Sequence, residues 1–241
     1  MTDATPTKAG ALVDAMDDAY AADAQRAEAF SGPTQAYSLM RDCCVPVFAM
    51  WILGKHEFRD VLDVGCGTGS HARIFAGFAG KVTGLDAAEG AVEIARQRTA
   101  AIGNLEFRTA DIFTAELGHG LYDFAHVREF HPLTRDIYDD DTAKREAHRA
   151  IVSKIAAAVA PGGYIYIAHV KGKRQCMDVD ACRGIEGVDV VAHGIDTRML
   201  FLLAPVMGYR RVSLTLAKLL SLPFRLWRSR FFEMIVLKRL P

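Results

Sequence analysis

The sequence predicts an α/β fold in which a doubly wound, mostly parallel sheet carries helices on both faces. Short apolar stretches alternate with longer stretches of helical character from about residue 60 to residue 170, and strands that alternate with helices form parallel βαβ units. The first apolar stretch also runs directly into a glycine-rich turn. The chain has 241 residues, of which 51% are hydrophobic, which suits one such domain with a helical extension.

The stretch DVLDVGCGTGSHARIFA, residues 60–76, predicts a strand, a tight turn and a helix. Residues 61–64 form an apolar run typical of a buried parallel strand. A helix-forming run follows over residues 71–79. Between them, glycines allow a ligand to approach bare backbone at a helix N-terminus. These glycines are Gly65, Gly67 and Gly69.

The spacing of these glycines bears on the ligand. A dinucleotide-binding G-x-G-x-x-G turn would place its third glycine at position 70, which is Ser70. The third glycine is instead Gly69, so the pattern is G-x-G-x-G and argues against a nicotinamide cofactor.

The remaining elements follow in order along the chain. Two helical stretches precede the first strand, at 7–30 and 35–54, and two long helices are expected at 88–103 and 142–160. Further strands are expected at 81–87, 105–112, 122–130 and 164–170.

The C-terminal part predicts a different kind of strand pairing. Residues 209–220 and 231–240 both have strand character, and only about ten residues join them, too few for a helical crossover. We therefore expect them to pair as an antiparallel hairpin.

Three aspartates fall in or near the carboxyl ends of predicted strands. Ligands of open parallel sheets bind beyond these ends, where the strand order reverses. A carboxylate at Asp86 can accept hydrogen bonds from ribose hydroxyls, and one at Asp111 from the exocyclic amine of a base. Asp63 lies inside the first strand, just before the glycines. Together with the turn, these acids predict a nucleoside-binding rim.

Four segments in this order resemble the motifs of class I S-adenosylmethionine-dependent methyltransferases: VLDVGCGTG, VTGLDAAEGAVEIAR, LEFRTADI and APGGYIYIAHV. The resemblance covers roughly residues 60–240. It implies a Rossmann-like sheet of seven strands with the last strand antiparallel, in agreement with the terminal hairpin. It further implies a helical N-terminal lid over 1–55, a cofactor-binding domain over 56–241, and an acceptor-side insertion at 171–193.

The same resemblance implies the site residues. The turn would lie against the methionine part of S-adenosylmethionine, Asp86 would bind the ribose, and strand-four residues would lie beside the transferable methyl group. The implied cofactor-binding set is Asp63, Gly65, Cys66, Gly67, Gly69, Asp86, Ala87, Asp111, Ile112, His126 and Val127, and the lid aromatics are Tyr20, Phe30 and Tyr37.

The segment HVREFHPLTRD after the fourth strand supplies the catalytic candidates. A histidine can accept a proton near neutral pH, and an arginine can bind a carboxylate or phosphate. Alternation along a strand would separate these side chains onto two faces, unless the strand ends early, which Pro132 favours. The candidates are His126, Arg128, Glu129 and His131.

Composition excludes several other classes. Twenty-nine basic residues balance 29 acidic ones, so a nucleic-acid partner is not expected. The longest apolar stretch, 45–53, is too short to span a bilayer, and no signal peptide is evident. Five cysteines without metal-ligand spacing predict reduced thiols, no metal and a cytoplasmic protein. The sequence does not decide whether the protein forms a homodimer.

The sequence thus predicts an enzyme that transfers the methyl group of S-adenosylmethionine to a nitrogen or oxygen atom of a small molecule, with S-adenosylhomocysteine as product. Two alternatives keep the cofactor site. In one, the enzyme consumes S-adenosylmethionine by intramolecular cyclisation and releases methylthioadenosine. In the other, the chain is a non-catalytic cofactor-binding protein.

Overall fold

The computed structural model describes residues 49–50, 53–55, 57–134, 137–170, 179–195 and 232–241. The predicted helix at 7–30, most of the predicted helix at 35–54, the lid aromatics and the predicted strand at 209–220 lie outside these residues. The described residues 49–50 and 53, within the second of these helices, are helical.

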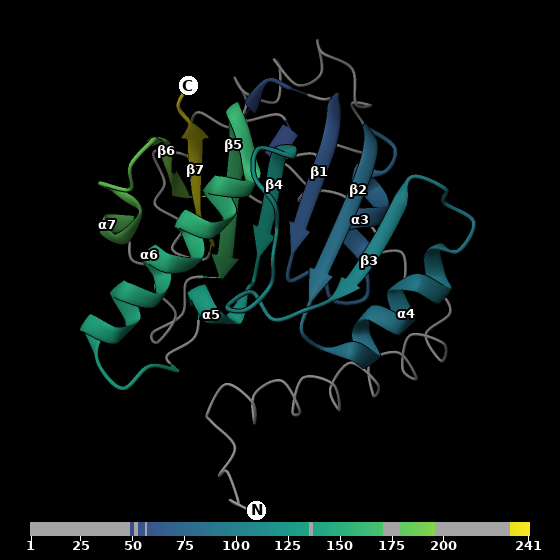
Figure 1. The fold of residues 1–241 in the computed structure, drawn as a ribbon, viewed down its shortest axis with the longest axis horizontal. Coiled ribbons are helices and arrows are strands. Elements are labelled where there is room, and N and C mark those ends of the chain that lie inside the picture. The colour runs from purple at the N-terminus through teal and green to yellow at the C-terminus, as the bar shows by residue number, and fades with distance from the viewer. Residues whose placement is uncertain (1–48, 51–52, 56, 135–136, 171–178, 196–231) are drawn as a thin grey trace, which may run out of the picture.

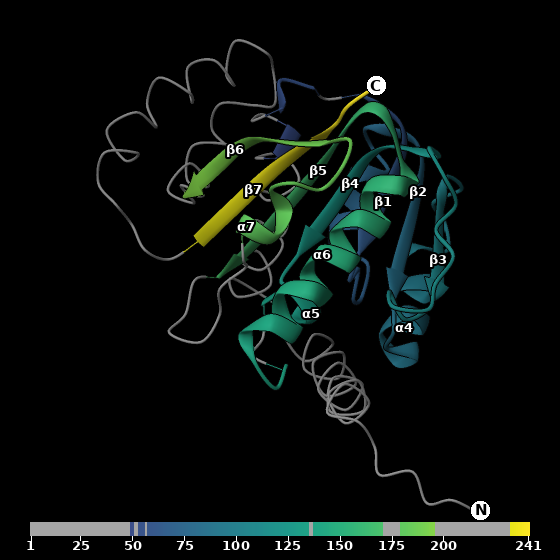
Figure 2. The ribbon, with the colours of Figure 1, turned by 60° about the vertical axis from the view of Figure 1, so that its left-hand side comes forward.

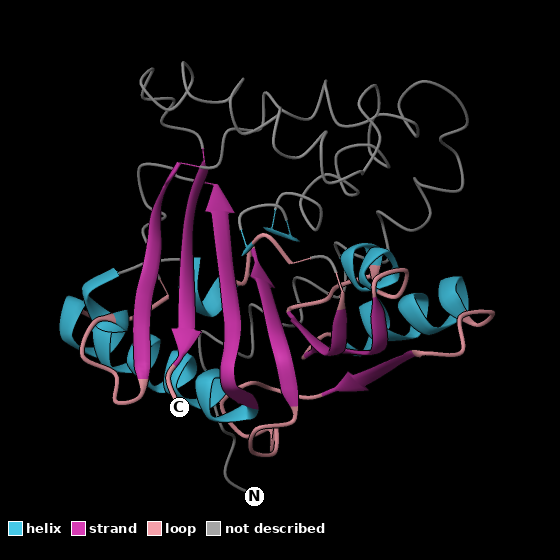
Figure 3. Ribbon diagram, turned by 90° about the horizontal axis from the view of Figure 1, so that it is seen from above, coloured by secondary structure: helices cyan, strands magenta, loops and turns pink. Residues whose placement is uncertain are grey.

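The described strands form one seven-stranded sheet in the order β3-β2-β1-β4-β5-β7-β6 (Figures 1 and 3). Neighbouring strands from β3 to β5 pair in parallel, and β7 pairs antiparallel with both β5 and β6. The predicted fold class, a mostly parallel sheet with an antiparallel strand at its C-terminal end, is therefore confirmed. The predicted partner of that strand is corrected: β7 lies between β5 and β6 and pairs with residues 188–195, where we expected residues 209–220. The strands are β1 Phe58–Val64, β2 Ala79–Asp86, β3 Leu105–Thr109, β4 Tyr122–Arg128, β5 Val159–Val170, β6 Val188–Ile195 and β7 Phe232–Arg239.

Helices cover both faces of this sheet. Side chains of α3 and α4 belong to one apolar core, and side chains of α5, α6 and α7 belong to the other. Figure 1 shows α3 behind the sheet and α6 in front of it, and Figure 2 shows α6 running in roughly the same direction as the strands β4, β5 and β7. The helices are α3 Ser70–Phe75, α4 Glu89–Thr99, α5 His131–Thr134, α6 Asp141–Ala158 and α7 Val179–Cys182.

Alternation along the strands explains why both faces are apolar. In β1, Val61 packs in the core below α3, while its neighbours Leu62 and Val64 pack in the core below α6. A parallel sheet buried on both faces needs apolar residues at nearly every position. This leaves Asp63, which is 2% exposed on the α3 face, as a polar exception inside β1.

Several predicted boundaries differ from the structure. The third strand ends at Thr109, so Asp111 follows it in a turn, and the fourth strand ends at Arg128 instead of residue 130. The fourth strand ends early because Glu129 has a left-handed backbone, with φ of 49°. Residues 188–193, which we expected in an acceptor-side insertion, lie in β6.

Candidate functional site

The glycine turn between β1 and α3 has a backbone that suits only glycine. Its three glycines have φ angles of 73°, 51° and 78°, all in the left-handed region. The turn lies where the strand order reverses, between β1 and β4, which is where open α/β sheets bind ligands. These glycines are Gly65, Gly67 and Gly69.

Aromatic rings hold the turn closely on the protein side. A Cβ added at Gly65 would lie 2.7 Å from Cδ2 of Phe130. One added at Gly69 would lie 2.8 Å from Cζ of Phe107. Any side chain at either position would therefore displace the turn from the end of the sheet.

Asp86 connects the glycine turn to the end of β2. Its Oδ2 accepts a hydrogen bond from the Gly67 amide at 2.8 Å, and its Oδ1 accepts one from the Ala88 amide at 3.0 Å. Burial raises the pKa of this carboxyl, and the hydrogen bonds from the same two amides oppose that rise. Each carboxylate oxygen keeps a lone pair for a further donor. Asp86 therefore shapes the turn and can still bind ligand hydroxyls.

Asp111 lies on an exposed turn after β3. Its Oδ1 accepts a hydrogen bond from the Phe113 amide at 2.9 Å. The neighbouring Ile112 is buried in the core below α6, which anchors the turn to the sheet. Its other oxygen, Oδ2, accepts no hydrogen bond from the described residues, so it can accept one from a ligand.

His126 and Asp63 form a buried pair on adjacent strands. They are register partners in β4 and β1, and His126 Nδ1 lies 2.7 Å from Asp63 Oδ1. His126 has no exposed surface, and its ring contacts include the rings of Phe75 and Tyr166. Within the described part of the chain, Asp63 Oδ2 and His126 Nε2 have no hydrogen-bond partner.

This burial corrects the expectation that the side chains of His126 and Val127 lie beside a transferred methyl group. Both are 0% exposed, and Val127 points into the core below α6. Side chains inside the sheet layers cannot contact an acceptor in this conformation. Cys66 is also buried, and burial together with the nearby Asp63 and Asp86 raises the pKa of its thiol well above the usual value.

The other catalytic candidates follow at the carboxyl end of β4, on different sides. Arg128 donates from Nη1 to Nε2 of His71 in α3, across 2.9 Å, so it lies on the α3 face. Glu129 is half-buried in its left-handed conformation, and its amide donates to Ala168 O of β5 at 2.9 Å. His131 begins α5 and is half-buried.

Sequence reasoning missed two polar residues near the predicted site. His71, the partner of Arg128, was considered only as a helix former. Lys154 of α6 donates to the carbonyl oxygens of Ile112 and Phe113, both at 2.8 Å. Its position on a helix distant in sequence gave no local signal for this contact.

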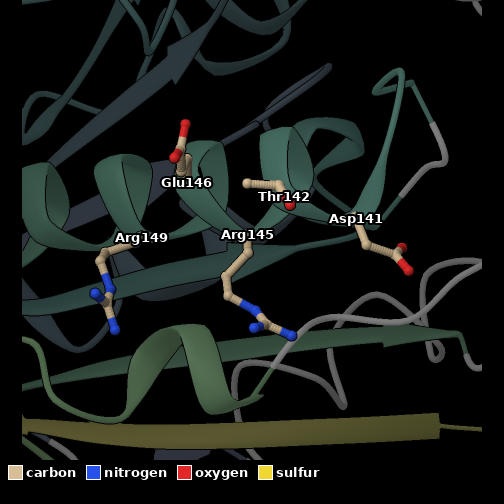
Figure 4. Close-up of a pocket in the computed structure, with 5 residues that line it drawn as sticks. All are labelled: Asp141, Thr142, Arg145, Glu146 and Arg149. Atoms are coloured by element: carbon tan, nitrogen blue, oxygen red, sulfur yellow. The ribbon is translucent and has the colours of Figure 1, made fainter.

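A hollow on the surface of α6 lies among residues that the sequence did not single out. In Figure 4, Arg145 and Arg149 extend to one side of the helix and Glu146 to the other. The lining side chains are exposed and of both charge signs, which does not define one ligand. They are Asp141, Thr142, Arg145, Glu146 and Arg149.

Among the described helices, none is long and apolar enough to cross a membrane. In the same part of the chain, no group of three or more His, Cys, Asp or Glu side chains is placed to hold a metal ion.

Comparison with known proteins agrees with this fold. No curated protein sequence matches the chain. A magnesium protoporphyrin IX methyltransferase, ChlM from Synechocystis PCC 6803 with bound S-adenosylmethionine, superposes with a TM-score of 0.62 at 17% identity, over 99% of this chain and 100% of that one. The N-methyltransferase NodS from Bradyrhizobium japonicum WM9, in complex with S-adenosylhomocysteine, gives 0.54 at 14% identity, over 87% and 89%. The [4+2]-cyclase SpnF gives 0.51 at 16% identity, over 80% of each chain.

At these identities the superpositions show a shared fold. The sequence itself is more specific: a family model described as a methyltransferase domain matches residues 61–163, from β1 to the start of β5. The matched segment contains the glycine turn, Asp86, Asp111 and the end of β4. Residues 61–163 therefore match a methyltransferase domain, in agreement with the resemblance of this sequence to the class I S-adenosylmethionine-dependent methyltransferases.

Proposed function

We propose that this protein binds S-adenosylmethionine at the glycine turn and transfers its methyl group to a nitrogen or oxygen atom of a small-molecule acceptor. The observation that carries the proposal is the bond between Asp86 Oδ2 and the Gly67 amide, 2.8 Å long. This hydrogen bond connects two parts of the site. One is the glycine turn, where side chains at Gly65 and Gly69 would clash, and the other is a carboxylate that can bind ribose hydroxyls.

The described residues fit such a cofactor in three respects. The turn lies where the strand order reverses, and added Cβ atoms at Gly65 and Gly69 would clash there. Asp86 keeps acceptor capacity for the ribose hydroxyls, and Asp111 lies exposed on the rim for the adenine amine. Asp63, in contrast, is buried directly before the turn and paired with His126, so we do not propose that its side chain contacts the cofactor.

When bound, the cofactor supplies an electrophilic methyl group on its sulfonium. The protein's contribution is then largely positional, because holding two reactants in line lowers the barrier by several kcal/mol. The turn and Asp86 would fix the position of the cofactor relative to the acceptor. The acceptor would lie at the carboxyl end of β4.

Glu129 and His131 are the groups that we propose for proton removal from an acceptor that arrives protonated. Both are half-buried and follow β4 directly. Arg128 is proposed to orient the acceptor from the α3 side, where His71 holds its guanidinium. His126 is not proposed for direct catalysis, because it has no exposed surface.

The experiment is incubation of the protein with S-adenosylmethionine and separate sets of amines, phenols and carboxylic acids. Mass spectrometry would follow S-adenosylhomocysteine and products heavier by one methylene unit. Acceptor-dependent product from one set supports the proposal and names the acceptor class. Binding without turnover on any set would favour a non-catalytic cofactor-binding protein.

A second candidate is a reaction other than methyl transfer. The fold is shared with a [4+2]-cyclase, so the fold alone does not fix the chemistry. The same incubation without any acceptor distinguishes this candidate. Methylthioadenosine with a small cyclic product would replace the methyl-transfer proposal by intramolecular cyclisation.

A further inference from the structure

The connection between β3 and β4 has no helix, although it crosses the sheet. It runs over residues 110–121 as turns and coil and carries Asp111 at its start. Since β3 is the edge strand and β4 lies beyond β1, the connection crosses the ends of two strands. Without a helix, its backbone groups must find other hydrogen-bond partners.

Asp111 and Lys154 supply these partners. Asp111 holds the amides: its Oδ1 accepts from Phe113 N at 2.9 Å, and its carbonyl oxygen accepts from Ala115 N at 2.7 Å. Lys154 holds the carbonyls, donating to the oxygens of Ile112 and Phe113 at 2.8 Å each. Lys154 comes from α6, whose neighbouring side chains Ile151 and Ile155 are buried in the sheet core.

Hydrogen bonds from a charged donor are stronger and more directional than those between neutral groups. Two of them from one ammonium group to successive carbonyls fix the orientation of that stretch of backbone. The Asp111 carboxylate is held by the amide between these carbonyls, so its orientation depends on the same stretch. Removing the ammonium would leave both carbonyls without this partner and let the turn rotate.

We propose that Lys154 is a positioning residue for recognition of the adenine ring: it holds the 111–114 turn so that Asp111 Oδ2 faces the exocyclic amine. This inference rests on the proposed function, since it concerns the same cofactor site. It extends that site to a helix residue that does not itself contact the cofactor.

The test measures the affinity for S-adenosylhomocysteine and for S-inosylhomocysteine, its analogue with a carbonyl in place of the adenine amine. The wild-type protein should bind S-adenosylhomocysteine, which carries the amine, more tightly than S-inosylhomocysteine. Lys154→Met should weaken S-adenosylhomocysteine binding by about fivefold or more and bring the two affinities closer together. Lys154→Arg, which keeps charged donors, should restore part of the preference. A merely structural effect would weaken both ligands equally and leave their ratio unchanged.

Lys144→Met is the matched control on the same helix. In the part of the chain that the structure describes, the Lys144 side chain makes no hydrogen bond, so this variant should keep the wild-type ratio. A Lys154→Met protein with the wild-type ratio would overturn the inference. So would a wild-type protein that binds both ligands equally well. A wild-type protein that binds neither ligand would instead contradict the proposed function.

Discussion

His126 Nδ1 lies 2.7 Å from Asp63 Oδ1, in the interior of the sheet and directly before the glycine turn. The two residues are 0% and 2% exposed. This distance is that of a hydrogen bond between the imidazole ring and the carboxyl group. The pair holds together the strands β1 and β4, between which the strand order reverses. We assign His126 a structural role at the base of the site.

His126→Ala should therefore destabilise the fold strongly. The substitution leaves the Asp63 carboxylate buried without its hydrogen-bond partner, which costs about 3 kcal/mol or more. Urea denaturation measures the loss, and His119→Ala, at an exposed histidine, is the control. Asp63→Asn should cost less in the His126→Ala background than in the wild type. A change below about 0.5 kcal/mol for His126→Ala would show that the pair contributes little.

Gly65→Ala should destabilise the turn. Its Cβ would lie 2.7 Å from the Phe130 ring, and φ of 73° disfavours any L side chain. We expect a loss of about 2 kcal/mol in unfolding free energy. Gly103→Ala is the matched control, because nothing lies within 4 Å of its added Cβ. Equal thermal denaturation midpoints for the two variants would contradict this account of the turn.

Glu129 should carry backbone strain. A left-handed conformation costs a residue with a side chain about 1 kcal/mol, and glycine avoids that cost. Glu129→Gly should therefore raise the unfolding free energy by up to about 1 kcal/mol, whereas Glu129→Ala should not. Both variants should lose turnover if the carboxylate is needed for proton removal. Equal stability of the two variants would argue against a strained position, and full activity would remove Glu129 from the mechanism.

The pH dependence of cofactor binding should follow the protonation of the Asp86 carboxyl. Burial raises the pKa of this carboxyl, and its ionised form is the better acceptor for ribose hydroxyls. Affinity for S-adenosylhomocysteine should therefore be constant near neutral pH and fall as pH drops, beginning at a higher pH than for an ordinary aspartate. Calorimetry across this range tests it, and Asp86→Asn should remove the dependence.

Protonation of Asp86 should not unfold the protein at low pH, so unfolding caused by Asp86 would not explain a loss of affinity there. A raised pKa means that the folded protein binds this proton more tightly than the unfolded chain does. The contribution of Asp86 to stability is thus fully present below the pKa of the unfolded chain and is lost as pH rises through the raised value. A fall in affinity at low pH would accordingly reflect the site, provided that the protein remains folded there.

Local patterns in the sequence predicted the sheet and the nucleoside-binding rim. Apolar runs predicted the strands, and the glycine spacing placed the turn before α3, since both depend on residues close together in the chain. The motifs also placed Asp86 beside the turn, where the structure has it.

Contacts between distant segments were not predictable in this way. His126 was expected at the cofactor, but the register of β4 against β1 pairs it with Asp63. The end of β4 lies two residues before the predicted one. Pro132 favours an early end, but no pattern indicates a left-handed backbone at Glu129. Lys154 reaches Ile112 across 42 residues of sequence, and only tertiary packing brings them together.

The most direct test of the central claim is calorimetric titration of S-adenosylhomocysteine into the wild-type protein and into Asp86→Ala. The account predicts saturable binding to the wild type and an affinity lower by about tenfold or more in the variant, with both proteins folded. No binding to the wild type, or equal affinity in a folded Asp86→Ala protein, would contradict it.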